Sequence, residues 1–254
     1  MKKAKAKTRL PEWPEQDTVK SHDWRLYAVT AVSEDSGGFK RGDVIKAAFP
    51  LKLDDGTTVQ AGAPNLDGLI LDFAARLDVE ARDLQAEMMA LTADGRMVED
   101  ATLFEVLQKR MGSAVFAFTA LESFANEVIS NAYYQGFQYE QTQPSGIVAV
   151  RSYEDLLRHV STDEKLASVL PAHLKLLSPK GGVHWRNFQR LKKIRNRIIH
   201  LKGADRGNSV DKSLWEEMLD PVACDFGNQM HDLIGYYVPH VIGLNFRWFY
   251  KWPH

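Results

Sequence analysis

An arginine, an asparagine and a histidine lie within six residues of one another, at Arg195, Asn196 and His200. A guanidinium stays charged at neutral pH and can hold two phosphate oxygens at once. An imidazole exchanges its proton near neutral pH, so it can act as a base or as an acid. A carboxamide can orient either the phosphate or the ring. The three residue types together predict chemistry on an anionic substrate.

The surrounding run, LKKIRNRIIHLKG at Leu191–Gly203, predicts the helix that positions these groups and that ends at the glycine. The apolar stripe expected to face the core consists of Leu191, Ile194, Ile198 and Leu201. The opposite side is expected to carry Lys192, Arg195, Asn196, Ile199 and His200. An isoleucine among polar groups indicates a surface that another molecule or another helix of the same chain covers.

Charged residues are strongly segregated along a chain whose net charge is only −1. Residues 175–206 contain ten Lys or Arg and one acid, whereas residues 54–110 contain twelve acids and five bases. A basic block in a nearly neutral protein is expected to attract polyanions such as nucleic acids. The alternative is a solvated helix face whose charges are balanced by scattered acids.

The composition argues against several classes of protein. One cysteine, Cys224, rules out an internal disulfide and fits a reducing cytoplasm, which is the expected location. No apolar run approaches the ~20 residues of a membrane span, and the basic start of the chain lacks the apolar stretch of a secretory signal. Histidines and acids lack metal-ligand spacing and no nucleotide-cofactor glycine pattern occurs, so we expect neither a metal nor a cofactor.

The chain is expected to be mainly α-helical, with a small β-containing element near its N-terminus. We expect a basic, disordered tail over residues 1–20, the β-containing element and leading helices over residues 21–95, and a helical domain over residues 96–254. Strand-like runs occur at 25–32, 44–50 and 51–59, and Asp54-Asp55-Gly56 predicts a hairpin turn. The helical pattern begins near Asn65 and includes Asp78–Leu91.

The longest regular pattern predicts one helix from about Asp100 to Tyr134, which would be ~50 Å long at 1.5 Å per residue. Its apolar seam is Phe104, Leu107, Met111, Ala114, Phe118, Leu121, Ala125, Val128 and Ala132. A polar line at the same spacing is Thr119, Glu122, Asn126 and Ser130. Downstream we expect a loop at 135–150, short helices at 153–160 and 163–170 with a Ser161 or Thr162 cap, and a helical stretch at 211–237 divided or kinked at Pro221.

Arg195-Asn196 with His200, flanked by LKKI and LKG and preceded by the helical LESFANEVIS run, resembles the HEPN superfamily. Members of that superfamily are compact helical bundles in which an arginine precedes a histidine by a short spacing on a late helix. The resemblance covers roughly residues 100–240 and implies a HEPN-like bundle with a long first helix.

The resemblance implies a metal-independent endoribonuclease that works as a homodimer, with two copies of the motif in one cleft. It implies catalytic roles for Arg195, Asn196 and His200 and supporting roles for Glu122 and Asn126. The structural alternative is that Arg195 pairs with Glu122 across the bundle, which would also hold Arg195 in place. The cations expected on RNA are Arg190, Lys192, Lys193, Arg197 and Lys202. Toxin–antitoxin and phage-defence settings are implied. Non-catalytic RNA-binding or protein-interaction modules, and subunits regulated by a partner such as an antitoxin, are alternatives within the same superfamily.

Overall fold

We describe the fold from a computed structural model that places residues 26, 29–31, 38, 40, 44–46, 48–142, 148–200, 213–244 and 246–252. The expected tail over residues 1–20 lies outside these described residues. Two compact units are present, one of Met1–Asn65 with Asn245–Lys251, the other of Leu66–Leu244 with Trp252–His254. The division therefore falls after Asn65 instead of near residue 95, because the first long helix packs with the helices that follow it.

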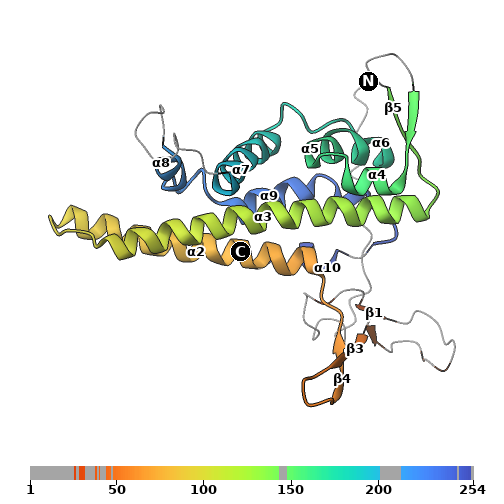
Figure 1. Ribbon diagram of the computed structural model, residues 1–254, viewed down its shortest axis with the longest axis horizontal. Helices are drawn as coiled ribbons and strands as arrows, with labels where there is room; N and C mark the ends of the chain where they lie inside the picture. Colours follow the sequence, from red (N-terminus) through yellow and green to blue (C-terminus); the bar gives the residue numbers. More distant parts are fainter. Residues whose placement is uncertain are drawn as a thin grey trace, which may run out of the picture. The chain divides into compact units, whose positions relative to one another are not determined.

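The larger unit is mainly α-helical, as the sequence predicts (Figure 1). Its long helices are α2 (Leu66–Ala93) and α3 (Asp100–Tyr134), and a β-hairpin follows, formed by β5 (Tyr139–Thr142) and β6 (Val148–Arg151). Next come α4 (Tyr153–Arg158), α5 (Thr162–Glu164), the π-helical segment η1 (Lys165–Val169) and α6 (Leu170–Leu174). The last elements are α7 (Val183–Ile199), α8 (Leu214–Met218), α9 (Phe226–Gly235) and the short 3-10 turn η3 (Val238–His240).

Helix α3 is the central element of this unit, and α2 runs antiparallel along it (Figure 1). The bounds of α3 match the prediction, and its apolar seam from Leu107 to Ala132 is buried except for the half-buried Met111. Phe104 was expected in that seam but is 58% exposed, which corrects the prediction. A second buried line beside the seam includes Val106, Ala117 and Phe124. Two buried lines are needed because α2 covers one side of α3 while α7 and α9 cover the other.

The connections confirm some predictions and correct one. Residues 135–150 were expected to be a loop, but β5 and β6 pair there as antiparallel strands in the register Tyr139↔Arg151. The alternating pattern of these short runs is weak on its own, and pairing supplies the backbone hydrogen bonds that hold them. Ser161 caps α5 by accepting from the Glu164 amide, as expected. The stretch containing Pro221 is divided into α8 and α9, also as expected.

The smaller unit contains the predicted β-containing element. Strands β1 (Val29–Ala31) and β2 (Val44–Lys46) pair antiparallel, and so do β3 (Ala48–Lys52) and β4 (Thr58–Gly62). The turn between β3 and β4 contains Gly56 at φ 84°, a conformation that favours glycine, and Asp55 accepts from the Thr57 amide at 2.8 Å. The predicted hairpin turn is therefore confirmed. A short helix, α10 (Arg247–Tyr250), belongs to the same unit.

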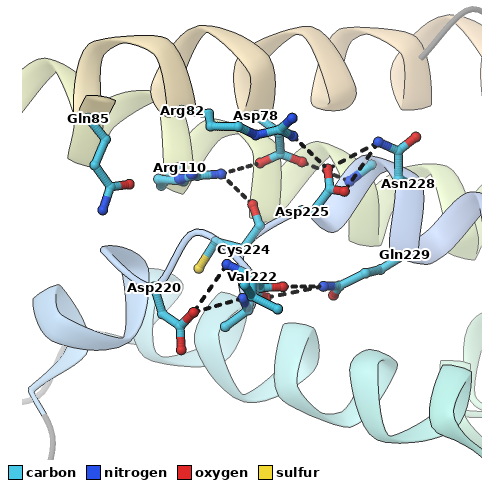
Figure 2. A network of polar contacts seen from close by, with 12 residues as sticks. Asp78, Arg82, Gln85, Arg110, Asp220, Val222, Cys224, Asp225, Asn228 and Gln229 are labelled. Carbon is cyan, nitrogen blue, oxygen red and sulfur yellow. Dashed lines mark hydrogen bonds and ion pairs between the residues drawn. The ribbon is translucent and has the colours of Figure 1, made fainter. Parts of the chain in front are cut away.

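A buried ion pair joins three helices of the larger unit (Figure 2). Asp78 of α2 and Arg110 of α3 are both fully buried and lie 3.3 Å apart. Arg110 also donates to the Cys224 carbonyl, and the second carboxylate oxygen of Asp78 accepts from the Gly227 amide at 2.9 Å. The carboxylate thus satisfies an orphan donor in the first turn of α9.

Gly227 permits this approach because α9 comes very close to α2 at that point. A Cβ added at Gly227 would lie 2.6 Å from the Cα of Ala75, which is shorter than real contacts allow. Any larger residue would push α9 away from α2 and from the Asp78 carboxylate. The position therefore requires glycine for space and not for its backbone angles.

Within the described ranges, none of the helices combines the length and the apolar character needed to cross a lipid bilayer.

Removing one partner of the buried pair is expected to destabilise the fold strongly. Asp78→Leu leaves the Arg110 charge buried without its partner and should lower the free energy of unfolding by about 3–5 kcal/mol. The double variant Asp78→Leu/Arg110→Met should recover most of that loss. Urea unfolding followed by circular dichroism measures wild type, these two variants and Arg110→Met, which together give the coupling energy of the pair. The exposed pair Arg158–Glu154 is the control, and the same set of variants there should give a coupling energy below about 1 kcal/mol. Equal coupling energies for the buried pair and the exposed pair would contradict this account.

The titration of Asp78 should also make the free energy of unfolding depend on pH, and the shift of its pKa fixes the direction of that dependence. Burial raises the pKa of Asp78 from 3.8 to about 6, and this outweighs the Gly227 amide and the Arg110 charge. The folded state then holds the proton more tightly than the unfolded state, so this contribution is present below pH 4 and lost as the pH rises through about 6. The free energy of unfolding of wild type minus that of Asp78→Asn should decrease as the pH rises from 4 to 6.5. A difference that rises over this range would mean that the Arg110 charge outweighs burial.

Candidate functional site

Helix α7 carries the predicted motif and is held against α3 by aromatic and aliphatic packing. Trp185, Phe188, Leu191 and Ile194 are buried, and the Phe188 ring stacks on Phe118 of α3 with centroids 6.1 Å apart. Figure 1 shows α7 alongside α3, between α8 and the group formed by α4, α5 and α6. The helix thereby holds its C-terminal residues in a defined place on the bundle.

Arg195 does not lie on the side of α7 where it was expected. Its guanidinium carbon sits 4.7 Å from the centroid of the Phe118 ring, and the residue is half-buried. The predicted apolar stripe begins at Leu191, and Arg195 is one turn beyond that residue. Trp185 and Phe188 widen the buried face in the direction of Arg195, so this residue points toward α3. The long apolar stem and the planar head of arginine suit such a position.

Asn196 and His200 are placed differently from Arg195. Asn196 is half-buried and its side-chain oxygen accepts from the Arg195 guanidinium at 3.1 Å. His200 is exposed and caps the C-terminus of α7, with φ −118° and ψ 51°. Its imidazole has no hydrogen-bond partner among the described residues. Ile199, beside it, is 47% exposed, which agrees with the expected apolar spot on this surface.

Most of the cations expected to contact RNA are engaged with acids of the same chain. Lys192 lies 2.8 Å from Asp163 at the start of α5. Lys193 and Arg197 both pair with Glu217 of α8, at 3.0 Å and 3.1 Å. Of the predicted set, only Arg190 is both exposed and without an ion pair to another described residue. Lys202, together with Leu201 and Gly203, lies outside the described residues.

The supporting residues Glu122 and Asn126 are half-buried on α3, one turn apart. The Arg195–Glu122 ion pair that the sequence suggested does not form between these two described residues. Their cationic neighbour is Lys165 instead, the first residue of η1, whose ammonium donates to the Asn126 oxygen at 2.8 Å. The sequence does not predict Lys165 at this place, because no spacing rule relates it to α3. The only available signal was a lysine directly before the mostly apolar run LASVL at 166–170.

The arrangement joins an oriented guanidinium to the amide that holds it, and an exposed imidazole lies at the end of the same helix. A half-buried carboxylate and a second amide follow along α3. Such a set can bind a phosphate and transfer protons without a metal ion.

Comparisons of the chain with protein-family models, with curated proteins and with solved structures find no match. The resemblance to the HEPN superfamily therefore depends on the residues described above.

The pairing with Glu217 predicts how the affinity for a polyanion can be raised. Glu217→Gln should remove the ion pairs that Lys193 and Arg197 make with this residue, so that single-stranded RNA binds more tightly. The slope of log affinity against log salt should steepen by roughly 0.7 for each additional phosphate group that the protein binds. Fluorescence anisotropy at several salt concentrations measures both quantities. Glu154→Gln on α4 makes the same charge change away from α7 and is the control; matching effects in the two variants would show that only net charge matters.

Proposed function

We propose that this protein is a metal-independent endoribonuclease of the HEPN type, acting as a cytoplasmic homodimer. The observation that carries the proposal is the arrangement at the C-terminal end of α7, where Asn196 and the Phe118 ring orient Arg195 and where His200 is exposed. A toxin or phage-defence role follows from the resemblance alone and is part of the same proposal.

In this proposal Arg195 binds the scissile phosphate and stabilises the charge that develops on it. A neutral His200 takes the proton of the ribose 2′-OH, and the 2′ oxygen forms a bond to phosphorus. The bond from phosphorus to the 5′ oxygen breaks, and a protonated His200 gives that oxygen its proton. The products are a 2′,3′-cyclic phosphate and a 5′-hydroxyl. If the proton is removed from the 2′-OH at the same time as the 5′ oxygen is protonated, a base and an acid are needed together, and a second copy of the chain would supply the second His200.

The exposed Ile199 supports the homodimer in this proposal. It lies next to His200, so an interface that covers it would bring the two His200 side chains toward one another. The area lost from water at one isoleucine is small, and neighbouring parts of the surface would have to contribute.

A second candidate is a non-catalytic module that binds RNA or a protein partner, for example as a subunit regulated by an antitoxin. The ion pairs of Lys192, Lys193 and Arg197 favour its protein-interaction form, because they reduce the positive charge offered to RNA. Tight RNA binding without cleavage would support this candidate against the first.

Incubation with total RNA in EDTA tests the proposed activity. Wild type should cleave, and Arg195→Ala and His200→Ala should each reduce the rate by about 10²–10⁴-fold, the range expected for loss of a proton-transfer or charge-stabilising group. Denaturing gels give the rates, and end-group analysis identifies the cyclic phosphate. Arg186→Ala, an exposed arginine on the first turn of α7, and His159→Ala, an exposed histidine after α4, are the matched controls. Cleavage that survives in both motif variants, or that requires Mg²⁺, would overturn the proposal.

A further inference from the structure

Lys165 is almost completely buried, with 1% of its surface exposed, although lysine is rarely buried without a specific partner. It opens the π-helical segment η1, which replaces regular α-helix between α5 and α6. Such wide turns in helices often occur at functional sites. The position therefore calls for an explanation beyond ordinary core packing.

Two hydrogen bonds hold the ammonium group of Lys165. Its Nζ atom donates to the side-chain oxygen of Asn126 and to the Leu157 carbonyl, each at 2.8 Å. Burial lowers the pKa of Lys165, and the Glu122 carboxylate opposes that effect by favouring the charged form. Lys165 thus connects η1 to α4 and to the polar line of α3.

The ammonium decides which way the Asn126 amide faces. Lysine can only donate, so Asn126 must turn its oxygen toward Lys165 and its NH₂ group away. That NH₂ group has no partner among the described residues, and it is not one of the fully enclosed, unpartnered polar atoms found there, so it is not sealed from solvent. The same holds for the Glu122 carboxylate, which accepts no hydrogen bond from the described residues. An amide donor and a carboxylate acceptor are therefore both open to a ligand.

The Glu122 carboxylate and the Asn126 amide lie one and two turns along α3 from the Phe118 ring, which the Arg195 guanidinium covers. Phe118, Glu122 and Asn126 are successive positions one turn apart on α3, at about 6 Å per step. Arg195 covers the first of them. A chain of nucleotides whose phosphate is held at Arg195 would place a neighbouring nucleotide beside Glu122 and Asn126, where a donor and an acceptor match the mixed edges of nucleobases.

We infer that Lys165 is a positioning residue for the proposed nuclease site. It fixes the Asn126 amide so that its NH₂ group, together with the Glu122 carboxylate, binds the nucleotide next to the cleaved bond. This inference rests on the proposed function and extends it to a subsite between α3, α7 and η1. The purely structural alternative is that Lys165 only satisfies the Leu157 carbonyl at the end of α4.

Asn126→Asp separates these two roles. The carboxylate still accepts from Lys165, so the contacts that hold η1 and α4 remain, but the outward NH₂ donor is gone. Single-turnover cleavage of a labelled RNA should slow by about 10-fold or more, the effect expected when a buried or half-buried hydrogen bond to substrate is lost, while the melting temperature does not fall. Unchanged cleavage in Asn126→Asp would overturn the inference.

Variants at Lys165 complete the test. Lys165→Met should slow cleavage at least as much as Asn126→Asp, and Lys165→Arg should restore part of the rate. Tyr237→Phe is the matched control, because the Tyr237 hydroxyl donates to the Leu166 carbonyl of the same η1 segment at 2.6 Å without contacting α3's polar line. If Tyr237→Phe lowers the rate as much as Lys165→Met at equal loss of stability, Lys165 has only a structural role.

Binding of RNA to the Arg195→Ala/His200→Ala background gives a readout that does not need cleavage. In that background Asn126→Asp and Lys165→Met should each weaken binding of a single-stranded RNA, by about 3–10-fold for one lost hydrogen bond. If wild type binds RNA in this way but never cleaves it, the proposed activity fails and the subsite stands. If affinity is unchanged in both variants, the subsite fails whatever the outcome for catalysis.

Discussion

The Phe118 ring is the point at which the hydrophobic core and the candidate site meet. Phe188 stacks on it and the Arg195 guanidinium covers it, and both come from α7, seven residues apart. Seven residues are two helical turns, so both side chains leave α7 on the same side. The packing that holds α7 on α3 therefore also sets the position of Arg195. Any shift of α7 along α3 would change where the guanidinium lies relative to Glu122 and Asn126.

Two buried polar clusters on α3 have different consequences. At one end Arg110 and Asp78 serve the fold, because the carboxylate meets both a guanidinium and the first turn of α9. Toward the other end Lys165 meets Asn126 and leaves an amide donor open to solvent. Burying a charge is costly unless it is paired, so both clusters are specific features of the sequence and not by-products of packing. Only the second leaves hydrogen-bonding capacity for a ligand.

The distribution of charge in three dimensions is milder than the linear sequence suggests. The basic block is the strongest electrostatic feature of the chain, but Asp163 and Glu217 come from other elements and form ion pairs with three of its cations, two of which share Glu217. Of the cations predicted for the described part of α7, Arg190 and the half-buried Arg195 remain for a polyanion. The site thus depends more on a few oriented groups than on a broad positive field.

The sequence by itself determined the helical class, the bounds of α3, the turn at Gly56, the Ser161 cap and the division at Pro221, because each follows from local spacing or local backbone chemistry. It also identified Arg195, Asn196 and His200 as a group, since they lie within six residues of one another. Only the tertiary structure decided that Arg195 faces Phe118, that Lys192, Lys193 and Arg197 are paired, and that Lys165 lies beside Asn126. Those facts depend on contacts between residues that are from 20 to 77 positions apart, and no periodicity within one helix encodes which residue of another helix it will meet.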